Sequence, residues 1–367
     1  MRVVHVIARF NQGGTATWLN NLIVGQRSKG DEVWLLAGHV DATEKEDIRF
    51  SYLGGIRVPN LMRKISILND VKSFFQIRRQ LKDLGIDIVN THTAKAGMIG
   101  RLAAWSLGAN RPCIVHTYHG HVLYGYFGKL ISSSFVLIER GLAKFTDQIF
   151  VSGIRVRNEL VESGIGRSES YLVLRPGVEI PVILEKRVVR VKFGIPEDVL
   201  VVGWLGRLTQ IKRPDRVIEL AHHFSNVVFL MGGEGELKRE LMHSKPANVI
   251  LSGWSNPNEI WSASDVALLT SDNEAQPISL IEAGMAGLPL VGEDVGSVSE
   301  VIVEGVNGFL ADDFESRKNA LQTLLSKEEL RISFGANAKK YCLMSFSEDQ
   351  FVASHRKAYF QLINSKN

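Results

Sequence analysis

Two glutamates eight residues apart, Glu274 and Glu282, could hold hydroxyl groups on either side of an anion site. Pro277 lies between them, after a short apolar strand pattern and a polar loop. Because proline costs nothing in a first helical turn, we expect a helix to begin there. The backbone N–H groups left unpaired at its start would be those of Ile278, Ser279 and Leu280. Such a helix end favours phosphate, so the segment indicates a nucleotide sugar: sugar at Glu274, diphosphate at the helix start, ribose at Glu282.

Spacing alone is weak evidence, because glutamates near a helix are usually solvated surface charges. The wider segment, Glu274-Ala-Gln-Pro followed by Glu282-Ala-Gly-Met-Ala-Gly-Leu-Pro289, resembles the Glu-x7-Glu motif of the retaining glycosyltransferase family 4. Family members usually have Gly-Phe where this chain has Ala275-Gln276. The segment Thr91–Arg101 is similar to the members that assemble bacterial surface polysaccharides.

Two cations five residues apart follow the predicted strand Val199–Leu205, as Gly206-Arg207-x4-Lys212. Surface charge would give the same pattern, yet it matches the family's pyrophosphate clamp. The resemblance implies that Arg207 and Lys212 neutralise the diphosphate leaving group. Since no Asp-x-Asp follows a strand and no His/Cys cluster has metal spacing, we expect a transfer without metal or other cofactor.

The first half of the chain carries a second set of candidates. Gly13 and Gly14 lie between an apolar strand and a helical pattern, which is a phosphate-cradle arrangement or a plain tight turn. His119 follows the strand pattern Cys113–Tyr118, and the resemblance implies that it contacts the donor sugar. The expected acceptor contacts are Lys95, His121 and Tyr124. In the second half, Gly253 and Trp254 follow another strand, where the family holds the base through backbone groups.

Alternating strand and helix patterns run through the chain twice, which predicts an α/β protein with two domains. The division is expected at Arg175-Pro-Gly, giving an acceptor-binding domain of residues 1–175 and a nucleotide-sugar-binding domain of residues 176–346. The resemblance implies the GT-B fold, with two Rossmann-like domains facing each other across a cleft. It also implies that the last helix, within residues 347–367, crosses back onto the first domain.

Composition and charge narrow the class of protein. The two cysteines suggest no disulfide framework, and no apolar run approaches a membrane span or a signal peptide, so a cytoplasmic protein is expected. Residues 1–175 hold 23 basic and 14 acidic side chains. A helix predicted over residues 65–84 should bury its apolar residues, while its basic face could contact anionic lipid peripherally. We expect no nucleic acid partner.

These observations predict a hexosyltransferase that acts with retention on a nucleotide diphosphate sugar. UDP is favoured over GDP from the resemblance. The acceptor is expected to be a saccharide, in particular a lipid-linked one used for cell-surface polysaccharide. Two alternatives stay open: a nucleotide-sugar 2-epimerase of the same fold, which needs no acceptor, and a non-enzymatic sugar-binding protein, which needs no diphosphate clamp.

Overall fold

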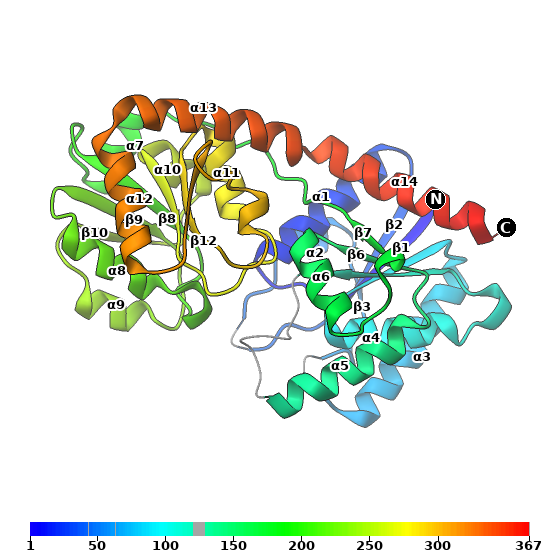
Figure 1. Cartoon of the computed structure of the whole chain (residues 1–367). Coiled ribbons are helices and arrows are strands. Elements are labelled where there is room, and N and C mark those ends of the chain that lie inside the picture. Colours follow the sequence, from blue (N-terminus) through cyan, green and yellow to red (C-terminus); the bar gives the residue numbers. More distant parts are fainter. Residues whose placement is uncertain (43, 63, 120–128, 367) are drawn as a thin grey trace. The chain divides into compact units, whose positions relative to one another are not determined.

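The computed structural model describes residues 1–42, 44–62, 64–119 and 129–366. The chain divides into two units (Figure 1). Unit 1 consists of Met1–Gly177 together with Glu348–Asn367, and unit 2 of Val178–Ser347. The boundary lies two residues beyond the position expected from the sequence.

Unit 1 is built on a seven-stranded sheet in the order β3-β2-β1-β4-β5-β6-β7, and all its strand pairs are parallel. Its strands are β1 (Arg2–Arg9), β2 (Glu32–Gly38), β3 (Ile56–Arg57), β4 (Ile88–His92), β5 (Cys113–Tyr118), β6 (Gln148–Val151) and β7 (Tyr171–Val173). Its helices are α1 (Gly14–Ser28), α2 (Arg49–Tyr52), α3 (Ile67–Leu84), α4 (Ala94–Trp105), α5 (Lys129–Ala143), α6 (Ile154–Glu162) and α14 (Glu348–Lys366). Val3, Val4 and Val6 of β1 are fully buried, as expected for a parallel strand covered on both faces.

Unit 2 repeats the design with a six-stranded parallel sheet, in the order β10-β9-β8-β11-β12-β13. Its strands are β8 (Leu200–Leu205), β9 (Val227–Gly232), β10 (Val249–Gly253), β11 (Val266–Leu269), β12 (Leu290–Glu293) and β13 (Gly308–Ala311). Its helices are α7 (Lys186–Phe193), α8 (Pro214–His223), α9 (Lys238–Ser244), α10 (Pro257–Ala263), α11 (Ile278–Ala286), α12 (Phe314–Ser326) and α13 (Glu328–Ser345).

Each sheet has a point where the strand order reverses. In unit 1 it lies between β1 and β4, and in unit 2 between β8 and β11. Open α/β sheets bind ligands outside the carboxyl ends of their strands at such switch points. The loops after β1 and β4 carry Gly13 and Thr93, and those after β8 and β11 carry Arg207 and Glu274. The topology therefore places three of the predicted residues, Gly13, Arg207 and Glu274, in loops at the edge of a sheet that favours ligands.

The C-terminal helix α14 packs beside α1 in unit 1 (Figure 1). Asn90 Nδ2 donates to the hydroxyl of the buried Tyr359 over 2.7 Å. Arg356 Nε lies 2.7 Å from Asp31 Oδ2. The helix is thus part of the core of unit 1 rather than an appendage.

Helix α3 departs from the sequence expectation. Only Ser73, Ile77 and Leu81 are buried, whereas Ile67 and Phe75 are 78% and 61% exposed. The apolar residues of this helix therefore form two faces. The face with Ile77 and Leu81 packs in the core with strand residues, and the face with Ile67 and Phe75 is exposed to solvent. No described helix is long and apolar enough to cross a bilayer.

Candidate active site

Glu274 and Lys212 form an ion pair at the switch point of unit 2. Lys212 Nζ donates to Glu274 Oε1, and Ser271 Oγ donates to the same oxygen over 2.7 Å. Within the described residues, no hydrogen bond reaches Oε2 of this carboxylate. Thr270 holds the backbone of Lys212 through Oγ1, which donates to the Lys212 carbonyl over 2.9 Å. The loops after β8 and β11 are thereby joined at the two charged side chains.

Helix α11 begins one residue later than predicted. Pro277 has φ −80° and ψ 83°, so it is the N-cap residue rather than part of the first turn. The N–H of Ile278 donates to the Gln276 carbonyl over 3.0 Å, so the prediction that this amide is unpaired is wrong. In the described part of the chain the N–H groups of Ser279 and Leu280 have no backbone partner. No side chain of the described residues caps the helix, and its first turn contains no acidic residue.

Glu282 lies one turn into α11 and is partly buried. Trp261 Nε1 donates to its Oε2 over 3.4 Å, which is a weak hydrogen bond. Burial raises the pKa of Glu282 to about 7, and the charge of Glu179 adds to the effect. The carboxylate is therefore short of hydrogen-bond donors, and ribose hydroxyls are donors of the required kind.

The loop after β8 brings a second cation to this edge. Arg207 is exposed, and within the described residues its side chain makes no ion pair. Its loop is fixed by backbone hydrogen bonds from Gly206 to Gly232 and from Leu208 to Glu234. The N–H of Gly233 donates to the Gly253 carbonyl over 2.7 Å, and Trp254 beside Gly253 is 70% exposed.

Gly296 is a site residue that the sequence did not single out. It has φ +51°, and a Cβ atom there would lie 1.6 Å from the Glu274 carbonyl oxygen. The N–H of Ser297 donates to that same oxygen over 3.2 Å. The loop after β12 thus supports the backbone of Glu274, and a helical or strand pattern gives no signal for such a contact.

In unit 1, His119 follows β5 and makes an edge-to-face contact with Trp18, with the ring centroids 4.6 Å apart and the ring planes at 84°. Its Nε2 lies 2.9 Å from His92 Nδ1. Burial lowers the pKa of His119 to about 3, and the nearby His5 contributes. His119 is therefore a neutral hydrogen-bonding group at physiological pH. Trp18, which shields it, was assigned only to a helical pattern in the sequence.

The other unit 1 candidates fall into three groups. Gly13, with φ 150°, caps α1, and open space surrounds the Cα atoms of Gly13 and Gly14, so a ligand could approach their backbone. Lys95 lies 2.5 Å from Asp70 and also donates to the Lys64 carbonyl, so an acceptor phosphate would have to displace an existing carboxylate. His121 and Tyr124 lie outside the described residues.

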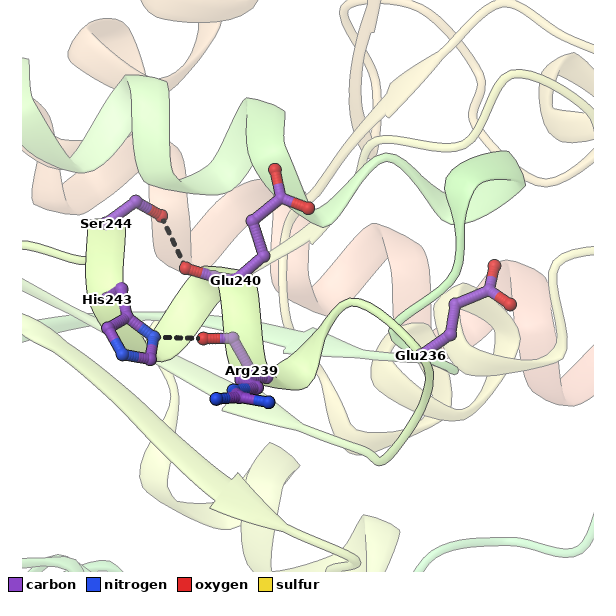
Figure 2. A pocket seen from close by; sticks show the side chains of 5 residues that line it. All are labelled: Glu236, Arg239, Glu240, His243 and Ser244. Atoms are coloured by element: carbon purple, nitrogen blue, oxygen red, sulfur yellow. Dashed lines mark hydrogen bonds between the residues drawn. The ribbon is translucent and has the colours of Figure 1, made fainter.

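A surface hollow lies elsewhere, on α9 and the turn before it (Figure 2). Its lining residues are Glu236, Arg239, Glu240, His243 and Ser244. His243 Nδ1 lies 2.6 Å from the Arg239 carbonyl, and Ser244 Oγ donates to the Glu240 carbonyl, so both polar side chains are bonded within their own helix. None of the predicted site residues that the structure describes lines this hollow. Across the described residues, no group of three His, Cys, Asp or Glu side chains is arranged to hold a metal ion.

Comparison with known proteins decides the class. A model described as Glycosyltransferase Family 4 matches residues 12–180, and one described as Glycosyl transferases group 1 matches residues 185–341. The chain belongs to glycosyltransferase family 4. Its two parallel-sheet units are the two Rossmann-like domains of the GT-B fold.

Relatives of this glycosyltransferase include the UDP-Gal:alpha-D-GlcNAc-diphosphoundecaprenol alpha-1,3-galactosyltransferase of Escherichia coli. The two are 29% identical over 335 residues, covering 84% of each chain. The capsular polysaccharide biosynthesis glycosyltransferase CapM of Staphylococcus aureus is 23% identical and covers 78% of this chain and 80% of its own. Among solved structures, HepE of Anabaena in complex with UDP and glucose matches with a TM-score of 0.82 at 17% identity. That match covers 98% of this chain and 100% of the other.

Proposed function

We propose that this glycosyltransferase moves a hexosyl unit from a UDP-sugar to a lipid-linked saccharide, with retention at the anomeric carbon and without a metal ion. The observation that carries the proposal is the ion pair of Lys212 with Glu274. Glu274 lies four residues before α11, where the N–H groups of Ser279 and Leu280 have no backbone partner among the described residues. The pair puts a cation and a hydroxyl-binding carboxylate beside an anion-binding helix end.

The leaving diphosphate would be stabilised by fixed positive charge. Lys212 and Arg207 supply two cations, and the α11 amides supply hydrogen-bond donors that need no reorganisation. Together they replace the charge that a divalent cation contributes in other transferases. Glu282 would accept hydrogen bonds from the ribose hydroxyls, and the backbone around Gly253 would hold the base.

Glu274 is better suited to binding hydroxyl groups than to attacking the anomeric carbon. Lys212 and Ser271 already occupy Oε1, and that shared charge lowers the nucleophilicity of the carboxylate. In the proposed reaction the acceptor oxygen attacks from the face that the diphosphate leaves. The acceptor proton passes to a departing phosphate oxygen, so the anomeric carbon–oxygen bond to phosphate breaks while the new glycosidic bond forms.

The names of relatives support the donor and acceptor classes. The Escherichia coli relative is a UDP-Gal transferase acting on a diphosphoundecaprenol saccharide, and the HepE structure contains UDP and glucose. The CapM relative acts in capsular polysaccharide biosynthesis. The first two names support a UDP-sugar donor, and the CapM name supports a role in bacterial surface polysaccharide synthesis.

The open face of α3 suits an acceptor that resides in a membrane. We define the α3 open face as Ile67, Leu68, Val71 and Phe75, which are all exposed. Helical spacing places these four residues on one stripe of the helix. The exposed Lys72 borders this stripe, and the exposed Lys82 lies on its continuation toward the end of the helix. Apolar residues flanked by cations match the surface of an anionic bilayer. We propose that this face rests on the cytoplasmic side of the cell membrane.

The test is product analysis with labelled UDP-sugars, with and without an undecaprenyl diphosphate saccharide, in buffer and in EDTA. Transfer is expected only with acceptor and to the same extent in EDTA. A modified nucleotide sugar formed without acceptor would indicate the 2-epimerase instead, and binding without any product would indicate a sugar-binding protein. The Glu282→Ala variant should lose nucleotide affinity, whereas His119→Ala should keep it and transfer more slowly. Wild-type rates in both variants would contradict these assignments.

A further inference from the structure

A row of histidines leads from the core of unit 1 to His119. Gln26 Oε1 lies 3.0 Å from His5 Nε2, and His5 Nδ1 lies 3.0 Å from His92 Nε2. His92 Nδ1 in turn lies 2.9 Å from His119 Nε2. The histidines come from β1, from β4 and from the end of β5, which are neighbours in the sheet. Gln26, His5 and His92 are fully buried, so water does not interrupt the row.

The direction of every hydrogen bond in this row follows from the orientation of the Gln26 amide, whose Oε1 faces His5 and whose buried Nε2 has no partner among the described residues. A neutral imidazole has one N–H donor and one acceptor nitrogen, so three linked rings must all point the same way. The Gln26 Oε1 oxygen can only accept, and therefore His5 Nε2 donates to it. His5 Nδ1 must then accept from His92 Nε2, and His92 Nδ1 must accept from His119 Nε2. The remaining nitrogen, Nδ1 of His119, carries a lone pair and no proton.

Burial keeps all three rings neutral, and the hydrogen-bond direction derived above requires neutral rings. It lowers the pKa of His5 to about 4 and that of His119 to about 3, and it lowers the pKa of His92 well below its ordinary value. The charged or titratable groups that face the row also disfavour protonation: Arg27 near His5, and His116 and His355 near His92. One added proton on any of the three rings would leave an N–H at Nδ1 of His119, so the bare Nδ1 requires all three rings to be neutral.

The outer nitrogen is available to a ligand. In the described part of the chain no hydrogen bond is made to Nδ1 of His119. The two ring nitrogens of an imidazole point in nearly opposite directions, so Nδ1 faces away from His92. The indole of Trp18 contacts both rings edge-on, with centroids 4.6 Å from His119 and 5.7 Å from His92. Trp18 thus protects the row without occupying Nδ1.

We propose that Gln26 and His5 are positioning residues that fix His119 as a hydrogen-bond acceptor, so that His119 selects a sugar hydroxyl able to donate to its Nδ1. The inference rests on the proposed function, because the hydroxyl is taken to belong to the donor sugar. It excludes a phosphate or carbonyl oxygen as the partner of Nδ1, since both can only accept. His119 then acts as a specificity residue for one hydroxyl position.

The first experiment reads the tautomers directly, by ¹⁵N NMR of the full chain labelled at histidine. Pyrrole-type and pyridine-type nitrogens have well-separated shifts, so His119 should show a protonated Nε2 and a bare Nδ1. The Gln26→Leu variant removes the inner acceptor and leaves the His5 N–H buried without a partner. Reversing the row relieves this, so a protonated Nδ1 should appear at His119.

Tyr359→Phe is the matched control, because it removes one buried hydrogen bond of the same core, the one with Asn90, outside the row. It should leave the His119 shifts unchanged. A wild-type His119 with a protonated Nδ1 would overturn the proposal, and so would unchanged His119 shifts in Gln26→Leu. If Gln26→Leu does not fold, the wild-type spectrum decides alone.

The second experiment uses donor analogues in which one hydroxyl is replaced by hydrogen or by fluorine at C3, C4 or C6. A carbon–fluorine group can accept but not donate. Where the replaced hydroxyl is the one that donates to His119, the kcat/KM of the wild-type enzyme should fall roughly five- to tenfold with the deoxy analogue. It should fall by the same factor with the fluoro analogue. In His119→Ala that loss should disappear.

Recovery of most of the activity by the fluorinated analogue would show that His119 donates, and the inference would fail. Failure of the proposed function looks different, because then the unmodified UDP-sugars would give no transfer at all. The NMR result does not depend on any donor.

Discussion

Lys212 is the residue whose loss should damage the proposed reaction most. Lys212→Met keeps the length of the side chain but removes the charge next to Glu274 and the leaving diphosphate. One fixed transition-state contact of this kind is commonly worth about 10²–10³ in kcat. We expect a loss of that size at saturating UDP-sugar, measured as initial rates of transfer.

Lys318→Met provides the matched control, because Lys318 pairs with Glu315 on the exposed face of α12. Its rate should equal that of the wild type. A Lys212→Met enzyme within about threefold of wild type would rule out the clamp role of Lys212.

Glu282 should give the protein a measurable pH dependence of stability. Its pKa is raised to about 7 by burial, against an ordinary value of 4.5. A raised pKa means that the folded state binds the proton more tightly, so the contribution is present below pH 4.5 and is lost as the pH rises through 7. Glu282→Gln should remove this loss, which amounts to about 3 kcal/mol at most.

The measurement is the free energy of unfolding of both proteins in urea at several pH values, without nucleotide. The buried histidines have lowered pKa values and act in the opposite sense, losing stability as the pH falls below 6.5. They are common to both proteins, so the difference between the two curves isolates Glu282. Parallel curves between pH 4.5 and 7 would show that its pKa is not raised.

At the residue scale, the sequence could indicate Glu274, Glu282, Arg207 and Lys212 because their spacing within short segments reflects the ligand they are proposed to hold. It could not indicate Gln26, His5 or Gly296. Those residues act through contacts with segments distant in sequence, such as the 87 residues between His5 and His92. Only the pairing of β1 with β4 brings those two rings together.

The loop after β12 sets the position of Glu274, and two glycines allow this to be tested. Gly296 and Gly305 both have positive φ, at +51° and +68°. A Cβ at Gly296 would meet the Glu274 carbonyl oxygen, whereas nothing lies within 4 Å of a Cβ at Gly305. Gly296→Ala should therefore lower both stability and transfer, by more than the roughly 1 kcal/mol that positive φ alone costs.

Gly305→Ala should show only that smaller cost in thermal unfolding and should transfer at the wild-type rate. If the two variants behaved alike, the contact between Gly296 and the Glu274 backbone would have no special role.

The α3 open face should bind anionic vesicles. In sedimentation with vesicles that contain anionic lipid, Phe75→Ser should lower binding at least tenfold, because burying a phenylalanine is worth about 1.5–3 kcal/mol. Charge reversal at Lys72 and Lys82 should weaken binding to the same vesicles but change little with neutral ones.

Ile332→Ser on α13 is the control, because Ile332 is also strongly exposed but belongs to unit 2. Its binding should match the wild type. Equal loss in Phe75→Ser and Ile332→Ser would assign the binding to general hydrophobicity.

At the element scale, apolar runs located the long strands well because parallel strands are buried on both faces. The two-residue strand β3 was missed, since Ile56 and Arg57 are too few to form a pattern. The start of α11 was placed one residue early, because proline is acceptable both as a cap and inside the first turn. Burial of α3 was overestimated because a helix pattern shows which residues are apolar but not which of them find a partner.

The two units should respond differently to nucleotide. Every hydrophobic cluster of the described residues lies within a single unit, so each unit has its own core. The proposed contacts to the UDP diphosphate, ribose and base, at residues 207–212, 253–254 and 279–282, lie in unit 2. UDP at about 100 times its dissociation constant should therefore stabilise unit 2 by about 2.7 kcal/mol.

Calorimetry with UDP, GDP, ADP and CMP, with and without magnesium, tests this. We expect two transitions, of which UDP raises one without metal. Tyr359→Ala should lower the other, because Tyr359 belongs to the unit 1 core. If UDP and Tyr359→Ala shift the same transition, the units unfold together, and if no nucleotide stabilises either, the proposed donor site in unit 2 is wrong.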